Sequence, residues 1–149
     1  MYLIDMSDGM SVDCTIDRLQ PVDFSQVKKN FSFDWKKEFR LFPVYKLSSR
    51  DRIQGLISLW HAESFLLLNL IELADYNVGK LKRFDRVAAT LIAFAASISL
   101  NEHDGYMVIM AKTSLINHYR DQYGFIQIGH SERMISYPRN TIKLVTLFL

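Results

Sequence analysis

The sequence has little cysteine, glycine or proline, and it lacks a long apolar run. Its single cysteine, Cys14, excludes an intramolecular disulfide and a zinc site built from several cysteines. The longest apolar stretch, residues 91–100, contains two serines and is about half the roughly 20 residues that a membrane-spanning helix needs. With only six Gly and three Pro, the regular elements should be long and the loops short.

The sequence also lacks a large excess of positive or negative charge. The 18 Lys and Arg residues against 16 Asp and Glu give a net charge of +2, which by itself argues for neither nucleic acid nor a membrane surface as a partner. Because the cations concentrate in one loop, we expect no nucleic-acid partner, and because the net charge is small and no apolar run is long, we expect no membrane partner. Asp5 and Asp8 lie where a secretory signal would need cations. Because 49% of the residues are hydrophobic, the chain can bury a full core. Together with its length and the lack of a signal-like start or a membrane-length apolar run, this leads us to expect a soluble, cytoplasmic, single domain over residues 1–149.

Hydrophobic periodicity predicts the order of the helices and strands. The predicted strands are 15–19, 41–47, 53–60, 65–73, 106–111 and 125–128, with one or two more in 133–149 separated at 138–140, the last over 142–149. The predicted helices are 24–31 capped by Asp23, 85–100 capped by Asp85, and 113 or 114 to 123 ended by Gly124. This order predicts an α+β fold of the three-layer type, with a mixed, mostly antiparallel central sheet of about six to seven strands and helices on both faces.

One basic segment precedes the helix predicted at 85–100. Lys80, Lys82, Arg83 and Arg86 fall within seven residues, before and inside its first turn. The free backbone N–H groups and the positive end of the helix dipole favour an anion there. A solvated basic loop is the alternative, but cations oppose the dipole unless an anion is bound. The segment therefore favours phosphate binding.

The same segment carries a resemblance to a known family. Residues 83–88, Arg-Phe-Asp-Arg-Val-Ala, lie at a strand-to-helix junction, and small and leucine residues follow at 89–92. This resembles the pyrophosphate loop, Q/R-x-x-G-x-G/A, of the GNAT superfamily of acetyl-coenzyme-A-dependent N-acetyltransferases. Residues 15–23 and 111–125, with Tyr119 and the pair Gly124-Phe125, are similar to its first strand and to its later strand and helix. The departures are Arg86 in place of the first glycine, Tyr119 five residues before Gly124, and a longer loop at 73–83.

The resemblance implies a GNAT-like fold and transfer of an acetyl group from acetyl-CoA to an unidentified amine on a small molecule or peptide. It implies coenzyme-binding roles for Leu70, Ile71, Leu73, Arg83, Arg86, Val87, Ala88, Ala89, Thr90, Asn117 and Tyr123. The alternative is a catalytically degenerate protein of this fold that serves as a CoA-binding sensor or interaction module. Arg86 separates the two, because a side chain that fills the pocket would exclude the coenzyme.

Two residues are candidates for proton transfer. Glu72, the one acidic residue in the central strand, is the candidate base, with His61 and Glu63 as second choices; a structural carboxylate paired with a loop cation is the alternative. Tyr119 is the candidate acid toward the coenzyme thiolate. Tyr123 competes for that role, and both rings could instead be packing residues. The four histidines show no metal-ligand spacing, so we expect no metal. We expect the protein to be a monomer or a homodimer.

Overall fold

The computed structural model describes residues 1–149, which form two compact units, Met1–Ser58 with Leu70–Leu91 and Leu59–Asn69 with Ile92–Leu149. The chain passes between the units within β5 (Arg52–His61), β6 (Leu66–Leu73) and α3 (Val87–Glu102). The predicted α+β class is confirmed. One sheet has seven strands in the hydrogen-bonded order β3-β4-β5-β6-β8-β10-β9 and is mostly antiparallel, and a second has three strands in the order β2-β1-β7.

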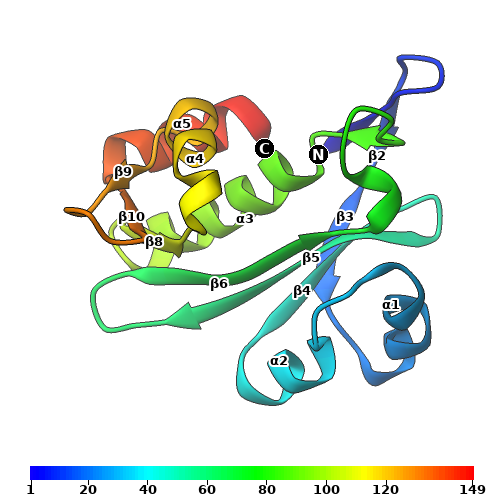
Figure 1. Ribbon diagram of the computed structural model, residues 1–149, viewed down its shortest axis with the longest axis horizontal. Coiled ribbons are helices and arrows are strands. Elements are labelled where there is room, and N and C mark those ends of the chain that lie inside the picture. The colour runs from blue at the N-terminus through cyan, green and yellow to red at the C-terminus, as the bar shows by residue number, and fades with distance from the viewer. The chain divides into compact units, whose positions relative to one another are not determined.

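In the first unit, β3 (Thr15–Arg18), β4 (Val44–Ser49) and β5 pair antiparallel. Two helices, α1 (Phe24–Asn30) and α2 (Trp35–Leu41), lie together on one side of these strands (Figure 1). Val27, Phe31 and Trp35 form their core with Val44 and Leu56. Burial of these side chains supplies the main driving force for the layer.

Asp23 occupies the N-cap position of α1, as predicted, but its side chain does not cap the helix. Asp23 ends a short 3-10 turn, η1 (Pro21–Asp23). Its carboxylate instead accepts hydrogen bonds from the Gln20 amide (2.8 Å) and from Lys46 Nζ (2.8 Å). Asp34 caps α2 by accepting a hydrogen bond from the Lys37 amide.

The first turns of α3 pack against β5 at Gly55. A methyl group added at Gly55 would lie 2.7 Å from Val87 Cγ1 and 2.9 Å from Leu91 Cδ1. Glycine therefore permits a close approach of helix and strand. The helix begins at Val87, so the cap predicted at Asp85 is wrong: Asp85 lies in β7 (Phe84–Asp85) and accepts a hydrogen bond from Lys82 Nζ (2.8 Å).

The N-terminal strand has two neighbours that the sequence pattern does not indicate. β1 (Tyr2–Asp5) pairs with β2 (Ser11–Asp13) on one side and with β7 on the other, both antiparallel. It is the central strand of the smaller sheet, and its side chains therefore meet the segment that immediately precedes α3.

In the second unit, the start of β6 pairs parallel with β8 (Met107–Met110), and β10 (Arg133–Ser136) runs antiparallel between β8 and β9 (Ile126–Gln127). The predicted helix at 113–123 is confirmed as η3 (Thr113–Leu115) followed by α4 (Ile116–Tyr123). It ends at Gly124, whose φ of 71° is left-handed, as predicted.

The strand predicted over 142–149 is wrong, because this segment is α5 (Pro138–Phe148), next to α4 in Figure 1. Pro138 occupies the first turn of the helix, where its missing N–H costs nothing, rather than breaking a sheet. Thr141, Leu144 and Phe148 recur at helical spacing and face inward. No helix of the chain is both long enough and apolar enough to span a membrane.

Candidate functional site

The segment between β6 and α3 is fixed in the first unit by a buried asparagine. Asn77 follows β6 in the short turn η2 (Asp75–Asn77). Its Nδ2 donates to the Gln54 backbone oxygen (3.1 Å) and to Gln54 Oε1 (3.0 Å), and its Oδ1 accepts from the Phe84 amide (3.0 Å). Because these bonds are buried, they hold both ends of the basic loop against β5.

Arg86, the departure from the glycine pattern, has a left-handed backbone. Its φ is 78°, a conformation that glycine adopts freely and that costs other residues on the order of 1–3 kcal/mol. The side chain is turned onto β1, where Nε donates to the Tyr2 backbone oxygen (3.3 Å) and the guanidinium lies 4.2 Å from the Tyr2 ring centroid. The backbone path expected of a glycine is thus retained.

The first turn of α3 presents backbone donors and one unsatisfied hydroxyl. The amides of Val87, Ala88 and Ala89 lie where helix geometry leaves N–H groups without an intrahelical acceptor. The first bond of the helix joins the Thr90 amide to the Arg86 oxygen (2.9 Å). Thr90 Oγ1 is buried and has no hydrogen-bond partner, and an unsatisfied buried hydroxyl costs about 1–3 kcal/mol. This turn suits an anion with acceptor oxygens.

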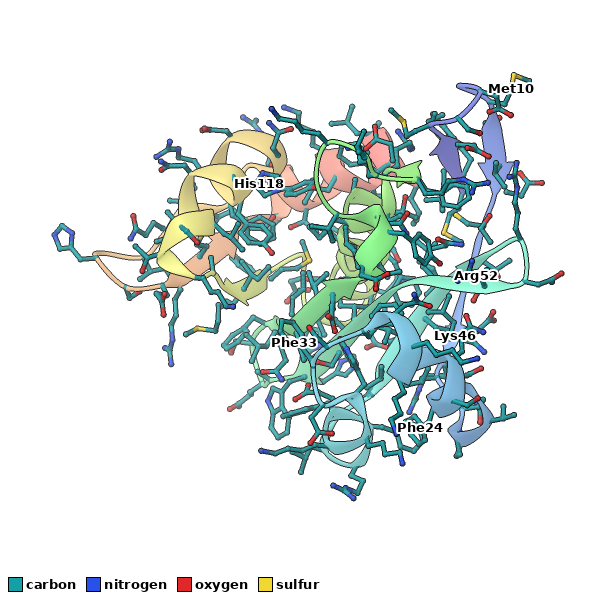
Figure 2. The ribbon with its side chains drawn as sticks, turned by 45° about the vertical axis from the view of Figure 1, so that its right-hand side comes forward. Met10, Phe24, Phe33, Lys46, Arg52 and His118 are labelled. Atoms are coloured by element: carbon teal, nitrogen blue, oxygen red, sulfur yellow. The ribbon has the colours of Figure 1, made fainter.

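A basic pocket of about 880 Å³ adjoins this segment. Its cationic lining residues are Arg50, Arg52, Lys80, Lys82 and Arg83, with Asp75 as the one acidic residue in the lining. Arg52 stands at the start of β5, beside the turn from β4 (Figure 2), and its guanidinium lies 4.9 Å from the Tyr76 ring centroid. Two separate segments therefore contribute positive charge to one concavity, which sequence spacing did not indicate.

Asp5 holds two of these cations in place from β1. The buried carboxylate lies 2.7 Å from Arg50 Nη1 and 3.5 Å from Arg83 Nε. Hydrogen bonds from the Ser7 hydroxyl (2.7 Å) and amide (3.0 Å), together with the two arginines, outweigh desolvation and lower the pKa of Asp5 to about 2. Asp5 is therefore ionised at neutral pH.

Glu72, the candidate base, is engaged by four donors. Its carboxylate accepts from the Ser32 amide (2.8 Å) and hydroxyl (2.8 Å), from the Phe33 amide (3.1 Å) and from Trp35 Nε1 (2.7 Å). Desolvation is the largest single influence and raises the pKa, but the hydrogen bonds together lower it below the ordinary value. These contacts favour the structural alternative, with neutral donors in place of a loop cation, because a base near neutrality needs a raised pKa.

Tyr119, the candidate acid, belongs to an aromatic group in the second unit. Its ring centroid lies 6.1 Å from that of Tyr123 and 6.2 Å from that of Phe125. Desolvation raises the pKa of the half-buried Tyr119 phenol. Asn117 is exposed. The contacts are those of packing, and a protonated phenol at neutral pH is also what an acid requires.

The predicted coenzyme residues divide between the two units. Those of the first unit are Leu70, Ile71 and Leu73 in the half-buried end of β6, Arg83 before β7, and Arg86, Val87, Ala88, Ala89 and Thr90 at the start of α3. Those of the second are Asn117, Tyr119 and Tyr123 on α4, with His61 and Glu63, the second choices for the base, at the end of β5 and in the turn that follows.

Although the histidines show no metal-ligand spacing in the sequence, the fold brings two of them together. His61 Nδ1 and His103 Nε2 are 2.9 Å apart, and Glu102 lies beside them. The two histidines are 42 positions apart in the sequence, so no local spacing could reveal the pair.

Comparisons with known proteins give matches in structure alone. A scan of protein-family models and a search of curated proteins both found no match. The AtaTR structure bound with AcCoA is 15% identical, has a TM-score of 0.62 and aligns over 89% of this chain and 98% of that one. The Bacillus subtilis N-acetyltransferase YlbP in complex with coenzyme A is 12% identical, with a TM-score of 0.62 over 85% and 98%. AtaT complexed with acetyl-methionyl-tRNAfMet is 15% identical, with a TM-score of 0.57 over 90% and 99%.

The chain therefore has the fold of the GNAT acetyltransferases, and the resemblance drawn from the sequence is confirmed at the level of the fold. The exclusion of nucleic acid is wrong, because AtaT, a protein of the same fold, is bound to a tRNA. That exclusion considered the cations of one loop, whereas the fold adds Arg50 and Arg52 to them.

Proposed function

We propose that the chain, acting as a single domain, is an acetyltransferase that uses acetyl-CoA and acetylates an amine. The observation that carries the proposal is the left-handed Arg86 ahead of α3, with its side chain turned onto Tyr2. A strained residue is maintained only where the surrounding structure holds it, and such residues cluster at functional sites. Here the conformation leads the backbone into the helix turn whose amides suit a phosphate.

In this proposal the amides of Arg86 to Ala89 bind the pyrophosphate, and the Thr90 hydroxyl gains the acceptor that it lacks in the free protein. The side chain of Arg83 adds positive charge beside them. Backbone groups of Leu70, Ile71 and Leu73 hold the pantetheine arm, and an amide of this strand donates to the thioester carbonyl. That donor stabilises the oxyanion that forms when the amine attacks.

Transfer is direct, with the acceptor nitrogen forming a bond to the acetyl carbon as the carbon–sulfur bond breaks. Tyr119 gives its proton to the departing thiolate, and Asn117 and Tyr123 contact the coenzyme. Desolvation raises the pKa of this phenol, so the proton stays on Tyr119 at neutral pH; its transfer to a thiolate, whose ordinary pKa is about 8.5, requires that the bound coenzyme bring the two pKa values together. Glu72 positions the connection between α1 and α2. The proton of the amine passes to water, from which Tyr119 regains the proton that it gave to the thiolate.

Calorimetric titration of the purified chain with acetyl-CoA tests the proposal. Ala88→Glu places a carboxylate at the pyrophosphate position and should abolish binding, while Val22→Glu, the same charge change at an exposed residue of η1, should bind like the unaltered chain. Absence of binding to the unaltered chain, or equal binding by Ala88→Glu, would remove the coenzyme site.

The basic pocket favours a second candidate, in which the acceptor amine is carried by an RNA. The supporting observations are the five lining cations and the tRNA bound to AtaT. Fluorescence anisotropy with a labelled tRNA should show a binding constant whose logarithm falls linearly with the logarithm of the salt concentration. Arg52→Glu should lower the binding constant and make this slope shallower. Binding unaffected by Arg52→Glu would exclude the pocket as the RNA surface.

A further inference from the structure

Three side chains with metal-ligating atoms meet in the second unit, and none of them is assigned to acetyl-CoA. They are His61, the last residue of β5, Glu102, the last residue of α3, and His103 after it. One ligand atom from each lies within 4.8 Å of the others. His61 Nδ1 is 2.9 Å from His103 Nε2 and 3.2 Å from Glu102 Oε2.

The backbone on both sides of this cluster is fixed. After His61, the Ala62 amide donates to the Phe65 oxygen (3.1 Å) and closes the β5–β6 turn. At the end of α3, the amides of His103 (2.7 Å) and Gly105 (3.0 Å) both donate to the Ser99 oxygen. The three side chains therefore extend from ordered elements rather than from a loose loop, which favours a preformed site.

Two of the three ligand separations suit a small divalent ion. In a tetrahedral site with metal–ligand bonds of about 2.0–2.1 Å, neighbouring ligand atoms are about 3.3 Å apart. The two distances from His61 Nδ1, 2.9 and 3.2 Å, differ from this separation by only a few tenths of an ångström. An ion between the rings would replace the hydrogen that now joins them, and the ring that donates this hydrogen would carry its proton on its other nitrogen instead.

His103 is the buried member of the cluster, with 9% of the residue exposed. His103 Nδ1 has no hydrogen-bond partner, so the site lacks the outer acceptor that typically contributes about 10–100-fold in metal affinity.

We propose that His61, Glu102 and His103 form a three-ligand site for a divalent transition-metal ion, with water in the fourth position. Two imidazoles and one carboxylate favour Zn²⁺, Co²⁺ or Ni²⁺ over Mg²⁺ and Ca²⁺, which prefer all-oxygen sites. The bound ion ties the β5–β6 turn to the end of α3. Without the outer acceptor on His103, we expect micromolar rather than tighter affinity.

The test uses the full chain after treatment with a chelator, titrated calorimetrically with ZnCl₂ and, in parallel, with Co²⁺ followed by its visible absorption. We expect one ion per chain and a tetrahedral Co²⁺ spectrum. His61→Ala should weaken binding at least tenfold, and Glu102→Gln should weaken it less. His130→Ala removes an exposed histidine of another turn and should bind like the unaltered chain.

Circular dichroism of each variant establishes that loss of binding is not loss of folding, and the exposed His61 makes its alanine variant a mild change. Absence of binding to the unaltered chain, equal binding by His61→Ala, or an equal loss in His130→Ala would each overturn the site. The proposal is independent of acetyl-CoA, because no ligand of the metal belongs to the assigned coenzyme residues.

Discussion

At position 86 we expect the glycine variant to be more stable than the alanine variant, which is the reverse of their usual order in a helix. Arg86 has a φ of 78°, which costs a residue with a β-carbon about 1–2 kcal/mol and costs glycine almost nothing. Arg86→Ala loses the contacts with Tyr2 and keeps this strain. Arg86→Gly loses the same contacts and relieves it.

Both variants also lose the free energy that the contacts with Tyr2 contribute to folding. A cation–π contact on a partly exposed ring contributes about 0.5–1 kcal/mol, and a long hydrogen bond of 3.3 Å contributes about 0.5 kcal/mol. Glycine also raises the entropy of the unfolded chain by about 0.4–1 kcal/mol. Arg86→Gly should thus be nearly neutral, and Arg86→Ala should be less stable than Arg86→Gly by about 1 kcal/mol.

Urea denaturation measures both free energies of unfolding, and the difference corresponds to about 4 °C in Tm. At exposed Gln122 in α4 the order should reverse, since alanine stabilises an ordinary helical position by about 1 kcal/mol over glycine. Because the side chain of Arg86 lies on Tyr2, both Arg86 variants should still bind acetyl-CoA. An alanine variant as stable as the glycine variant would refute the reasoning about strain.

Three further expectations concern single side chains. Tyr119→Phe should lower turnover far more than acetyl-CoA affinity in steady-state kinetics; unchanged turnover would leave the phenol a packing residue. Glu72→Gln should reduce the free energy of unfolding by about 1–3 kcal/mol, since an amide cannot accept all four hydrogen bonds. Because the folded pKa of Glu72 is lowered, its stabilisation is present above the unfolded pKa of about 4.3 and is lost as pH falls through the folded value; a difference from Glu72→Gln that did not shrink in acid would contradict this. Gly55→Ala should destabilise the chain by about 1–3 kcal/mol, because its methyl group would lie 2.7 Å from Val87 Cγ1; an unchanged melting curve would show that helix and strand can separate freely.

Local periodicity predicted the elements whose burial pattern is contained within them. The alternation of residues 15–19, the apolar run of β6 and the left-handed Gly124 are all properties of short windows of sequence. Helix α5 was missed because a single proline does not say which element follows it: Pro138 can end a strand or begin a helix equally well.

The candidate site divides in the same way. The basic loop and the start of α3 are contiguous in sequence, so a short window was enough to propose them as an anion site. Arg50 and Arg52 join the loop only because a turn between two strands brings them there, and His61 meets His103 only because a strand and a helix end together. Such juxtapositions depend on sheet pairing, which no single window encodes.

The substitution at the glycine position of the loop is therefore explained by a strand about 80 residues earlier in the chain. Tyr2 accepts the Arg86 side chain, β1 pairs with β7 immediately before it, and Asp5 binds Arg83. A large side chain at this position would block the anion site at the start of α3 only if no other space could hold it. Since β1 supplies that place, Arg86 keeps the backbone turn that glycine would make, and the first turn of α3 keeps its donors for an anion.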